Sequence, residues 1–106
     1  MIRRGEVYWC AVGTKTRPVV VVSGDLFNET RLDTVVVVPV YSSGQRPTHV
    51  HVEVEPTSGG VQGWANALEI SVQRRTLLSE WVGTVSAREL AEIDAAIRLV
   101  LFEELP

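Results

Sequence analysis

The fold of this chain is decided by one stretch, Arg17-Pro18-Val19-Val20-Val21-Val22-Ser23. Proline fixes φ and lacks a backbone donor, so it suits the first position of a strand, and four consecutive valines are typical of a strand buried on both faces. Arg17 therefore stands at the mouth of a buried strand. A guanidinium in that place suits phosphate binding, because it can donate to two oxygens at once and stays charged at neutral pH. The alternative is an ordinary surface arginine.

Length and composition indicate a single soluble domain over residues 1–106, short enough for a partner subunit in a homodimer to add to its core. No apolar run reaches membrane-spanning length, and the basic residues at 1–4 are not followed by the hydrophobic core of a signal peptide. We therefore expect a cytoplasmic protein without membrane contact. Cys10 is the only cysteine, so an internal disulfide and a multi-cysteine zinc site are excluded, and we expect it to be a small core residue.

The net charge of −3 does not exclude RNA as a partner, because the acidic excess is local. Residues 86–105 hold five acidic side chains against two basic ones, and the rest of the chain has eight of each. Those eight basic residues lie near predicted strand ends or loops, where several could converge on one face. They are Arg3, Arg4, Lys15, Arg17, Arg31, Arg46, Arg74 and Arg75.

Alternation and runs of β-branched residues predict six strands. They are expected at Glu6–Val12, Arg17–Ser23, Thr34–Val40, Thr48–Glu55, Gly63–Val72 and Leu77–Val85. Residues 25–30 are predicted to form a turn or a short helical piece, and residues 43–47 and 56–60 to form loops. Pro39 predicts that the third strand bends or leaves its ladder there, because proline cannot donate a sheet hydrogen bond.

A helix is predicted after Ser86. The sequence Ser86-Ala87-Arg88-Glu89 matches a capping box, in which the serine oxygen and the glutamate carboxylate satisfy free backbone donors reciprocally. Apolar residues then follow at helical spacing, at Leu90, Ile93, Ile97, Val100 and Leu101. We expect this amphipathic helix to pack on the sheet.

Two other groups of residues have a structural and a functional interpretation. His49, His51 and Glu53 share one face of a predicted strand and could offer metal ligands. A half-exposed strand gives the same pattern of polar residues, and no other residues complete a ligand set. We therefore expect no metal. The three tryptophans, Trp9, Trp64 and Trp81, could stack on bases; we expect core or interface packing for at least two of them.

The order of motifs along the chain resembles the MazF/PemK family of toxins from toxin–antitoxin systems. The resemblance begins with Arg4-Gly5-Glu6-Val7-Tyr8-Trp9 and the Arg17-Pro18 strand entry, which are its most specific parts. It continues through Asn28, the run from Thr34 to Pro39, Pro47-Thr48-His49-Val50, Gly63-Trp64-Ala65-Asn66-Ala67, Ile70 and Val82-Gly83 to the closing helix. It covers essentially the whole chain.

The resemblance implies a mainly β fold with a C-terminal helix, in the form of a small SH3-like or CcdB-like antiparallel barrel that is homodimeric. It further implies sequence-specific cleavage of single-stranded RNA without a metal or other cofactor, through attack by the 2′-hydroxyl of the RNA. A cognate antitoxin is the implied protein partner, with a segment that folds on binding.

The resemblance also assigns site residues. Arg17 matches a catalytic arginine of the family, and Tyr41 falls where the family commonly has a catalytic threonine, with Ser42 as a substitute hydroxyl. The general base is left open between Tyr41, Ser42 and Glu69. The predicted RNA-binding residues are Lys15, Thr16, Arg46, Glu69 and Arg74.

Three departures from the family pattern affect function. Tyrosine changes the reach and acidity of the hydroxyl at position 41, the loop at 13–16 is short, and Leu68 and Val72 stand where polar residues are common. Two alternatives to the ribonuclease therefore stay open: a gyrase poison that does not act as an enzyme, as in the CcdB family, and a catalytically weakened binding module.

Overall fold

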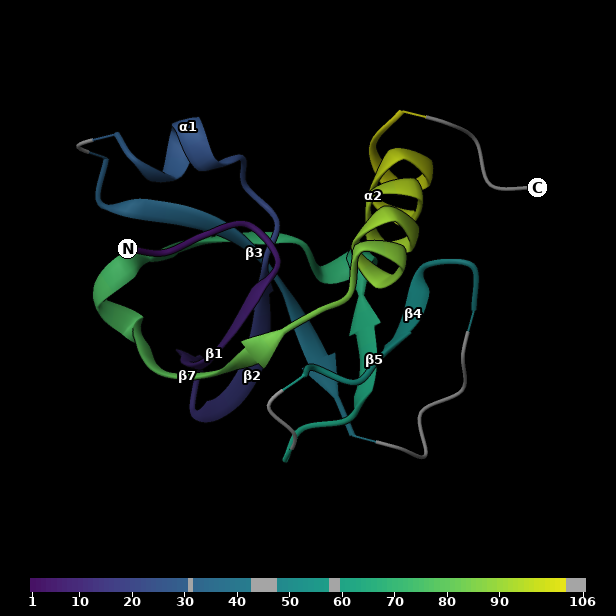
Figure 1. The fold of residues 1–106 in the computed structure, drawn as a ribbon, viewed down its shortest axis with the longest axis horizontal. Coiled ribbons are helices and arrows are strands. Elements are labelled where there is room, and N and C mark those ends of the chain that lie inside the picture. Colours follow the sequence, from purple (N-terminus) through teal and green to yellow (C-terminus); the bar gives the residue numbers. More distant parts are fainter. Residues whose placement is uncertain (31, 43–47, 58–59, 103–106) are drawn as a thin grey trace.

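An antiparallel sheet of seven strands carries one long helix at the C-terminal end of the chain (Figure 1). The computed structural model describes residues 1–30, 32–42, 48–57 and 60–102. The strands are β1 (Glu6–Val12), β2 (Lys15–Val21), β3 (Thr34–Tyr41), β4 (His51–Val54), β5 (Gly63–Asn66), β6 (Ser71–Arg74) and β7 (Leu78–Thr84). The helical segments are α1 (Asp25–Asn28), α2 (Ala87–Leu101) and two 3-10 turns, η1 (Ala67–Glu69) and η2 (Arg75–Leu77).

The strand order is β4-β5-β3-β2-β1-β7, with β6 also paired to β3. All pairs are antiparallel. Within the described residues no ladder joins β4 to β7, so the hydrogen-bonded sheet is curled but not closed into a barrel. The expected mainly β fold with a C-terminal helix is confirmed.

The predicted strand over Gly63–Val72 is interrupted. An unbroken continuation of the β3–β6 ladder, in which Val37 pairs with Ser71, would pair Val40 with Leu68, but Val40 pairs with Ala65 of β5. The three additional residues form η1, where the Asn66 side chain accepts a hydrogen bond from the backbone N–H of Leu68. An asparagine that bonds its own backbone two residues on favours a turn over a strand, and the periodicity of the apolar residues did not reveal it.

The other predicted boundaries hold with small shifts. The first strand has its predicted bounds, and the predicted strand over Thr48–Glu55 shortens to His51–Val54, because a turn brings the N–H of His51 to the carbonyl of Thr48. The capping box before α2 is confirmed, with Ser86 Oγ accepting from the backbone of Glu89 and the Glu89 carboxylate accepting from the backbone of Ser86. The loop predicted at 43–47 lies outside the described residues.

Two apolar clusters lie on the two faces of the sheet. The larger one includes Val20, Val38 and Ile93 and joins the sheet to α2, which packs beside β4 and η1 (Figure 1). The smaller one is built from Cys10, Val19, Val21, Val35 and Val37, all almost fully buried. Cys10 is thus a core residue, as predicted. None of the helices in the described parts of the chain is long and apolar enough to cross a membrane.

Candidate active site

A fork between β2 and β3 positions the candidate site. The ladder between these strands ends at the pair Val19 and Pro39. Beyond that pair β2 continues with β1 alone, while β3 continues with β5. Proline lacks the N–H that a ladder uses, so the prolines at 18 and 39 make this a natural point for pairing to stop. The expectation that β3 leaves a ladder near Pro39 is confirmed, although the strand itself runs on to Tyr41.

Arg17 and Tyr41 face each other across the fork. They occupy the positions that would pair two residues beyond Val19 and Pro39 if the ladder continued. The Arg17 guanidinium carbon lies 4.3 Å from the centre of the Tyr41 ring, a cation–π contact that fixes the orientation of both side chains.

The hydroxyl of Tyr41 is held by a carboxylate. It donates a hydrogen bond of 2.6 Å to Oε1 of Glu69, and Nδ2 of Asn66 donates one of 2.7 Å to Oε2 of the same carboxylate. Each carboxylate oxygen therefore accepts one hydrogen bond and keeps a further lone pair free, and η1 carries Glu69 beside β3. This arrangement places a cation and an anion on either side of one phenol.

Burial raises the pKa of Tyr41, and the hydrogen bond to Glu69 and the charge of that carboxylate raise it further, while the positive charge of Arg17 lowers it. The phenol consequently stays protonated at neutral pH. Tyr41 can donate a proton but is not an anionic base under these conditions.

A cavity of about 210 Å³ opens on this face of the sheet. Its polar lining comes from Arg17, Tyr41, Glu69, Ser71 and Gln73, and its apolar lining includes Val19 and Val37. Gln73 Nε2 donates to Ser71 Oγ at 3.1 Å. The cavity thus combines a cation, a carboxylate, two hydroxyls and an amide over an apolar floor, which suits a phosphodiester with an adjoining hydroxyl.

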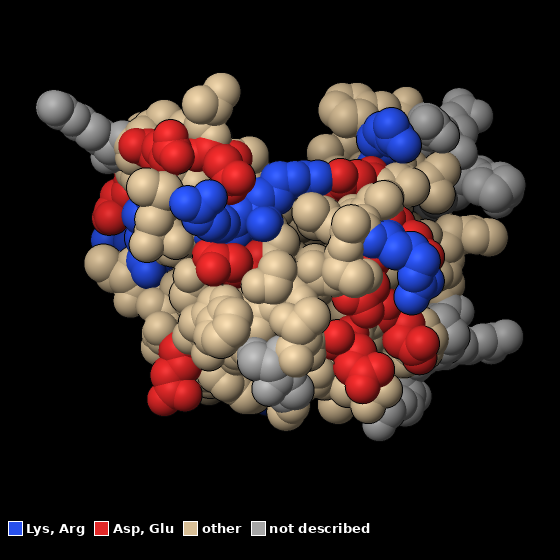
Figure 2. Space-filling view, in the orientation of Figure 1, with Lys and Arg blue, Asp and Glu red and all other residues tan. Residues whose placement is uncertain are grey.

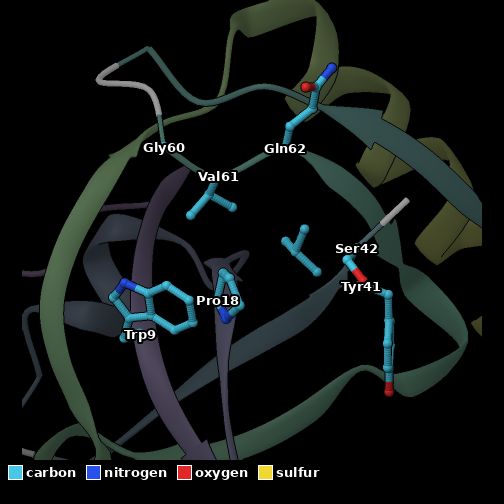
Figure 3. A pocket seen from close by; sticks show the side chains of 8 residues that line it. Trp9, Pro18, Tyr41, Ser42, Gly60, Val61 and Gln62 are labelled. Carbon is cyan, nitrogen blue, oxygen red and sulfur yellow. The ribbon is translucent and has the colours of Figure 1, made fainter. Parts of the chain in front are cut away.

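A second cavity, of about 180 Å³, lies on the other side of the fork. Figure 3 shows the side chains of Trp9, Pro18 and Val61 directed toward one another around it, while the Tyr41 ring and the Gln62 amide point away. Ser42 lines this second cavity rather than the one that holds Arg17.

The structure therefore separates the residues predicted for the site. Arg17, Tyr41 and Glu69 come together in one cavity, and Ser42 does not join them. Lys15 is exposed and, two residues from Arg17 along β2, lies on the same face, whereas Thr16 lies on the opposite face. Arg46 lies outside the described residues.

Arg74 is not brought to the cavity. It pairs with Thr34, and alternation along β6 turns it to the face opposite Ser71 and Gln73. Two more basic residues serve the fold: Arg4 pairs with Asp94 and donates to the carbonyl of Val22, and Arg75 bonds backbone carbonyls of residues 28 and 32. Basic and acidic side chains are intermixed on the face that Figure 2 shows. Among the described basic residues, Arg4, Arg74 and Arg75 therefore do not converge with Lys15 and Arg17, contrary to the expectation for these three.

Three polar residues of the site were missed from sequence: Asn66, Ser71 and Gln73. Ser71 and Gln73 alternate along β6 with the exposed residues Val72 and Arg74. The sequence signal for the two inward-facing polar residues was therefore a strand that directs polar side chains inward and an apolar one, Val72, outward.

The histidines and tryptophans that could bind a metal or stack on bases are placed as follows in the fold. His51 Nδ1 lies 2.8 Å from Thr48 Oγ1, and in the described residues no group of three His, Cys, Asp or Glu side chains is placed to hold a metal ion. None of the three tryptophans lies in the core of this chain: Trp9 and Trp64 are half-buried, and Trp81 is 51% exposed.

Comparison with known proteins identifies the family of this chain. The family model of PemK-like, MazF-like toxins of type II toxin–antitoxin systems matches residues 3–101. Endoribonuclease MazF2 of Mycobacterium bovis and Endoribonuclease MazF6 of Mycobacterium tuberculosis are each 31% identical over 111 aligned residues, covering 95% of this chain and 97% of the relative.

Solved structures agree as well. An endoribonuclease from a mycobacterial species, in complex with its cognate antitoxin, superposes with a TM-score of 0.87 at 25% identity, with both chains covered in full. A MazE–MazF complex from Deinococcus radiodurans shares the fold, with a TM-score of 0.78 at 22% identity and 95% of each chain covered. This chain belongs to the PemK-like, MazF-like family of toxins of type II toxin–antitoxin systems.

Proposed function

We propose that this toxin is an endoribonuclease that cuts single-stranded RNA at specific sequences, with no metal, by using the RNA's own 2′-hydroxyl as the nucleophile. The observation that carries the proposal is the placement of the Arg17 guanidinium and the Glu69 carboxylate on either side of Tyr41 in one cavity. RNA is the substrate because DNA lacks the 2′-hydroxyl.

Arg17 stabilises the charge that develops on the phosphate. Its guanidinium is fixed by the Tyr41 ring and by the rigid entry of β2, so little reorganisation is needed when the pentacovalent phosphorus forms. Donors that are preorganised in this way are usually the largest single contribution to catalysis.

Glu69 and Tyr41 move the protons. Glu69 accepts the proton of the 2′-hydroxyl, whose oxygen then bonds to phosphorus while the bond from phosphorus to the 5′-oxygen breaks. Tyr41, which the raised pKa keeps protonated, donates its proton to the departing 5′-oxygen. The hydrogen bond between the two residues lets Glu69 return its proton to Tyr41, and the products are a 2′,3′-cyclic phosphate and a 5′-hydroxyl.

The partners follow from the family. We propose that a cognate antitoxin binds this chain, as one binds the mycobacterial relative, and that the toxin is a homodimer. The apolar side chains of Leu68, Val72 and Trp81 are each more than half exposed, which supports an interface with another chain.

The test incubates the purified protein with a long transcript in EDTA. We expect cuts at specific sites, and we expect Arg17→Ala to lower the rate by roughly a hundredfold or more, by analogy with loss of an oxyanion donor. Arg88→Ala is the matched control, because Arg88 is 77% exposed on α2 and, among the described residues, forms an ion pair with Glu92 alone. Intact RNA together with trapped gyrase–DNA complexes would overturn the ribonuclease in favour of a gyrase poison.

A further inference from the structure

The second cavity at the fork has the features of a site for a flat aromatic ring. Its walls are the indole of Trp9, the ring of Pro18 and the side chains of Val40 and Val61 (Figure 3). Ser42 lies at its edge with a hydroxyl that can donate or accept. Unpaired bases of RNA are bound by stacking on such side chains, with hydrogen bonds to their edges.

The two cavities lie next to each other at the fork. Pro18 and Val40 line the second cavity, and their chain neighbours Arg17 and Tyr41 line the first. Successive residues of a strand face opposite sides, and no β2–β3 ladder fills the space beyond Val19 and Pro39. Tyr41 lines both cavities, which makes them adjacent sites on the two sides of the end of β3.

We propose that this second cavity binds one base of the RNA substrate, next to the phosphate that is cut, with Trp9 as the stacking residue and Ser42 as a hydrogen-bonding partner of the base edge. The inference rests on the proposed function, since it names a specificity site of the same reaction. It also gives Ser42 a role, in binding rather than in catalysis. Loss of one stacking partner is expected to weaken binding roughly 5- to 100-fold.

The first experiment compares cleavage maps of one long transcript for the wild type, Trp9→Ala, Val61→Phe and the control Arg88→Ala. Val61→Phe fills the cavity from a half-buried loop position and leaves Trp9 in place, and circular dichroism reports whether each variant is folded. We expect both cavity variants to lose base preference at a single position beside the cut and to cut about tenfold more slowly. Arg88→Ala, on α2 outside the cavity, should give the wild-type map.

A second readout separates failure of this inference from failure of the proposed function. In a Trp64→Phe, Trp81→Phe background Trp9 is the only tryptophan, and its fluorescence is titrated with poly(U) and poly(A) RNA. Quenching is expected whether or not the RNA is cut. Unchanged base preference in folded cavity variants of an active enzyme would overturn the inference and leave the ribonuclease intact. Quenching by the cognate antitoxin and not by RNA would overturn it as well, because the cavity would then hold a protein side chain.

Discussion

At the scale of single residues, Tyr41 links the two charged side chains of the candidate site. A threonine at this position, common in the family, would be too short to reach Glu69 and has no ring for Arg17 to stack on. Tyrosine does both, at 2.6 Å to the carboxylate and 4.3 Å from the guanidinium to the ring centre. Tyrosine in place of threonine therefore connects a cation and a carboxylate that a shorter hydroxyl would leave apart.

Tyr41→Phe tests the proton transfer. The ring that Arg17 stacks on is kept and only the hydroxyl is lost, so we expect kcat to fall roughly a hundredfold with little change in KM. The rate is measured on a short RNA that contains one mapped cut site.

A sulfur in place of the bridging 5′-oxygen provides the control, because a thiolate leaves without needing a proton. Tyr41→Phe should regain most of its rate on this substrate, whereas Glu69→Gln, which lacks the base, should not. An equal loss in Tyr41→Phe on both substrates would contradict the role of Tyr41 as the acid.

Tyr8 makes the alkaline stability of the fold predictable. Burial first, and then the hydrogen bond from its hydroxyl to Glu6 and the charge of that carboxylate, raise the pKa of Tyr8 to about 12. Between pH 10 and 12 the unfolded chain therefore loses the phenolic proton more readily than the folded one, so stability falls as the pH rises. Solvent screens the partly exposed ring, and we expect the effect to be about 1 kcal/mol or less.

Thermal unfolding of the wild type and of Tyr8→Phe at pH 8 and pH 11 measures the loss of folding stability at alkaline pH. The variant should be slightly less stable at pH 8, where it lacks the bond to Glu6, and should lose less stability than the wild type at pH 11. Equal losses in the two proteins would show that Tyr8 does not contribute.

At the scale of elements, the valine-rich strands were predictable from sequence. Their alternating or continuous apolar residues lie within a few positions of one another along the chain. The turn at η1 was not predictable, since it depends on Asn66 bonding the backbone within an apolar stretch. The capping box before α2 was predictable to the residue, because all its partners lie within four positions.

The site was half predictable for a similar reason. Arg17 stands out because a proline and a valine run follow it. Its contact with Tyr41 depends on the register of two strands 24 residues apart, which no local pattern encodes. The three residues of η1 change the pairing register with β3 between β5 and β6, and this register decides which face of the sheet Arg74 occupies. The predicted contact of Arg74 with RNA could therefore not be checked from the sequence.

Gly63 fixes how closely β5 approaches the end of β3. A Cβ at this position would collide with the backbone carbonyl of Tyr41, which cannot move without disturbing the site. We expect Gly63→Ala to destabilise the fold by about 1–3 kcal/mol and to lower cleavage more than the fraction of unfolded protein explains. Denaturant unfolding and cleavage rates are compared with Gly24→Ala, where an added Cβ meets no atom within 4 Å. Equal effects of the two substitutions would contradict the importance of this approach.

At the scale of the whole molecule, net charge works against RNA binding. The protein carries −3, and of its basic residues Arg4 and Arg75 are bonded within the fold and Arg74 faces away from the cavity. Among the described basic residues, Lys15 and Arg17 at the start of β2 lie on the face of the cavity, and we expect these two to supply most of the attraction for the phosphate backbone. This differs from proteins with a broad basic surface, which bind any nucleic acid at low salt.

The salt dependence of RNA binding should therefore be shallow. Each phosphate contact to a single strand contributes a slope of about −0.7 in a plot of log K against log salt concentration, so contacts by Lys15 and Arg17 alone give about −1.4. We expect Lys15→Ala to reduce the magnitude of the slope by about 0.7, because its side chain is exposed on the same face as Arg17. Arg88→Ala on α2 removes the same charge away from the site and should leave the slope unchanged. Fluorescence anisotropy with 2′-O-methylated RNA, which lacks the attacking hydroxyl, measures binding without cleavage. A slope steeper than about −3, or equal effects of the two substitutions, would mean that the RNA contacts a wider basic surface than the fork provides.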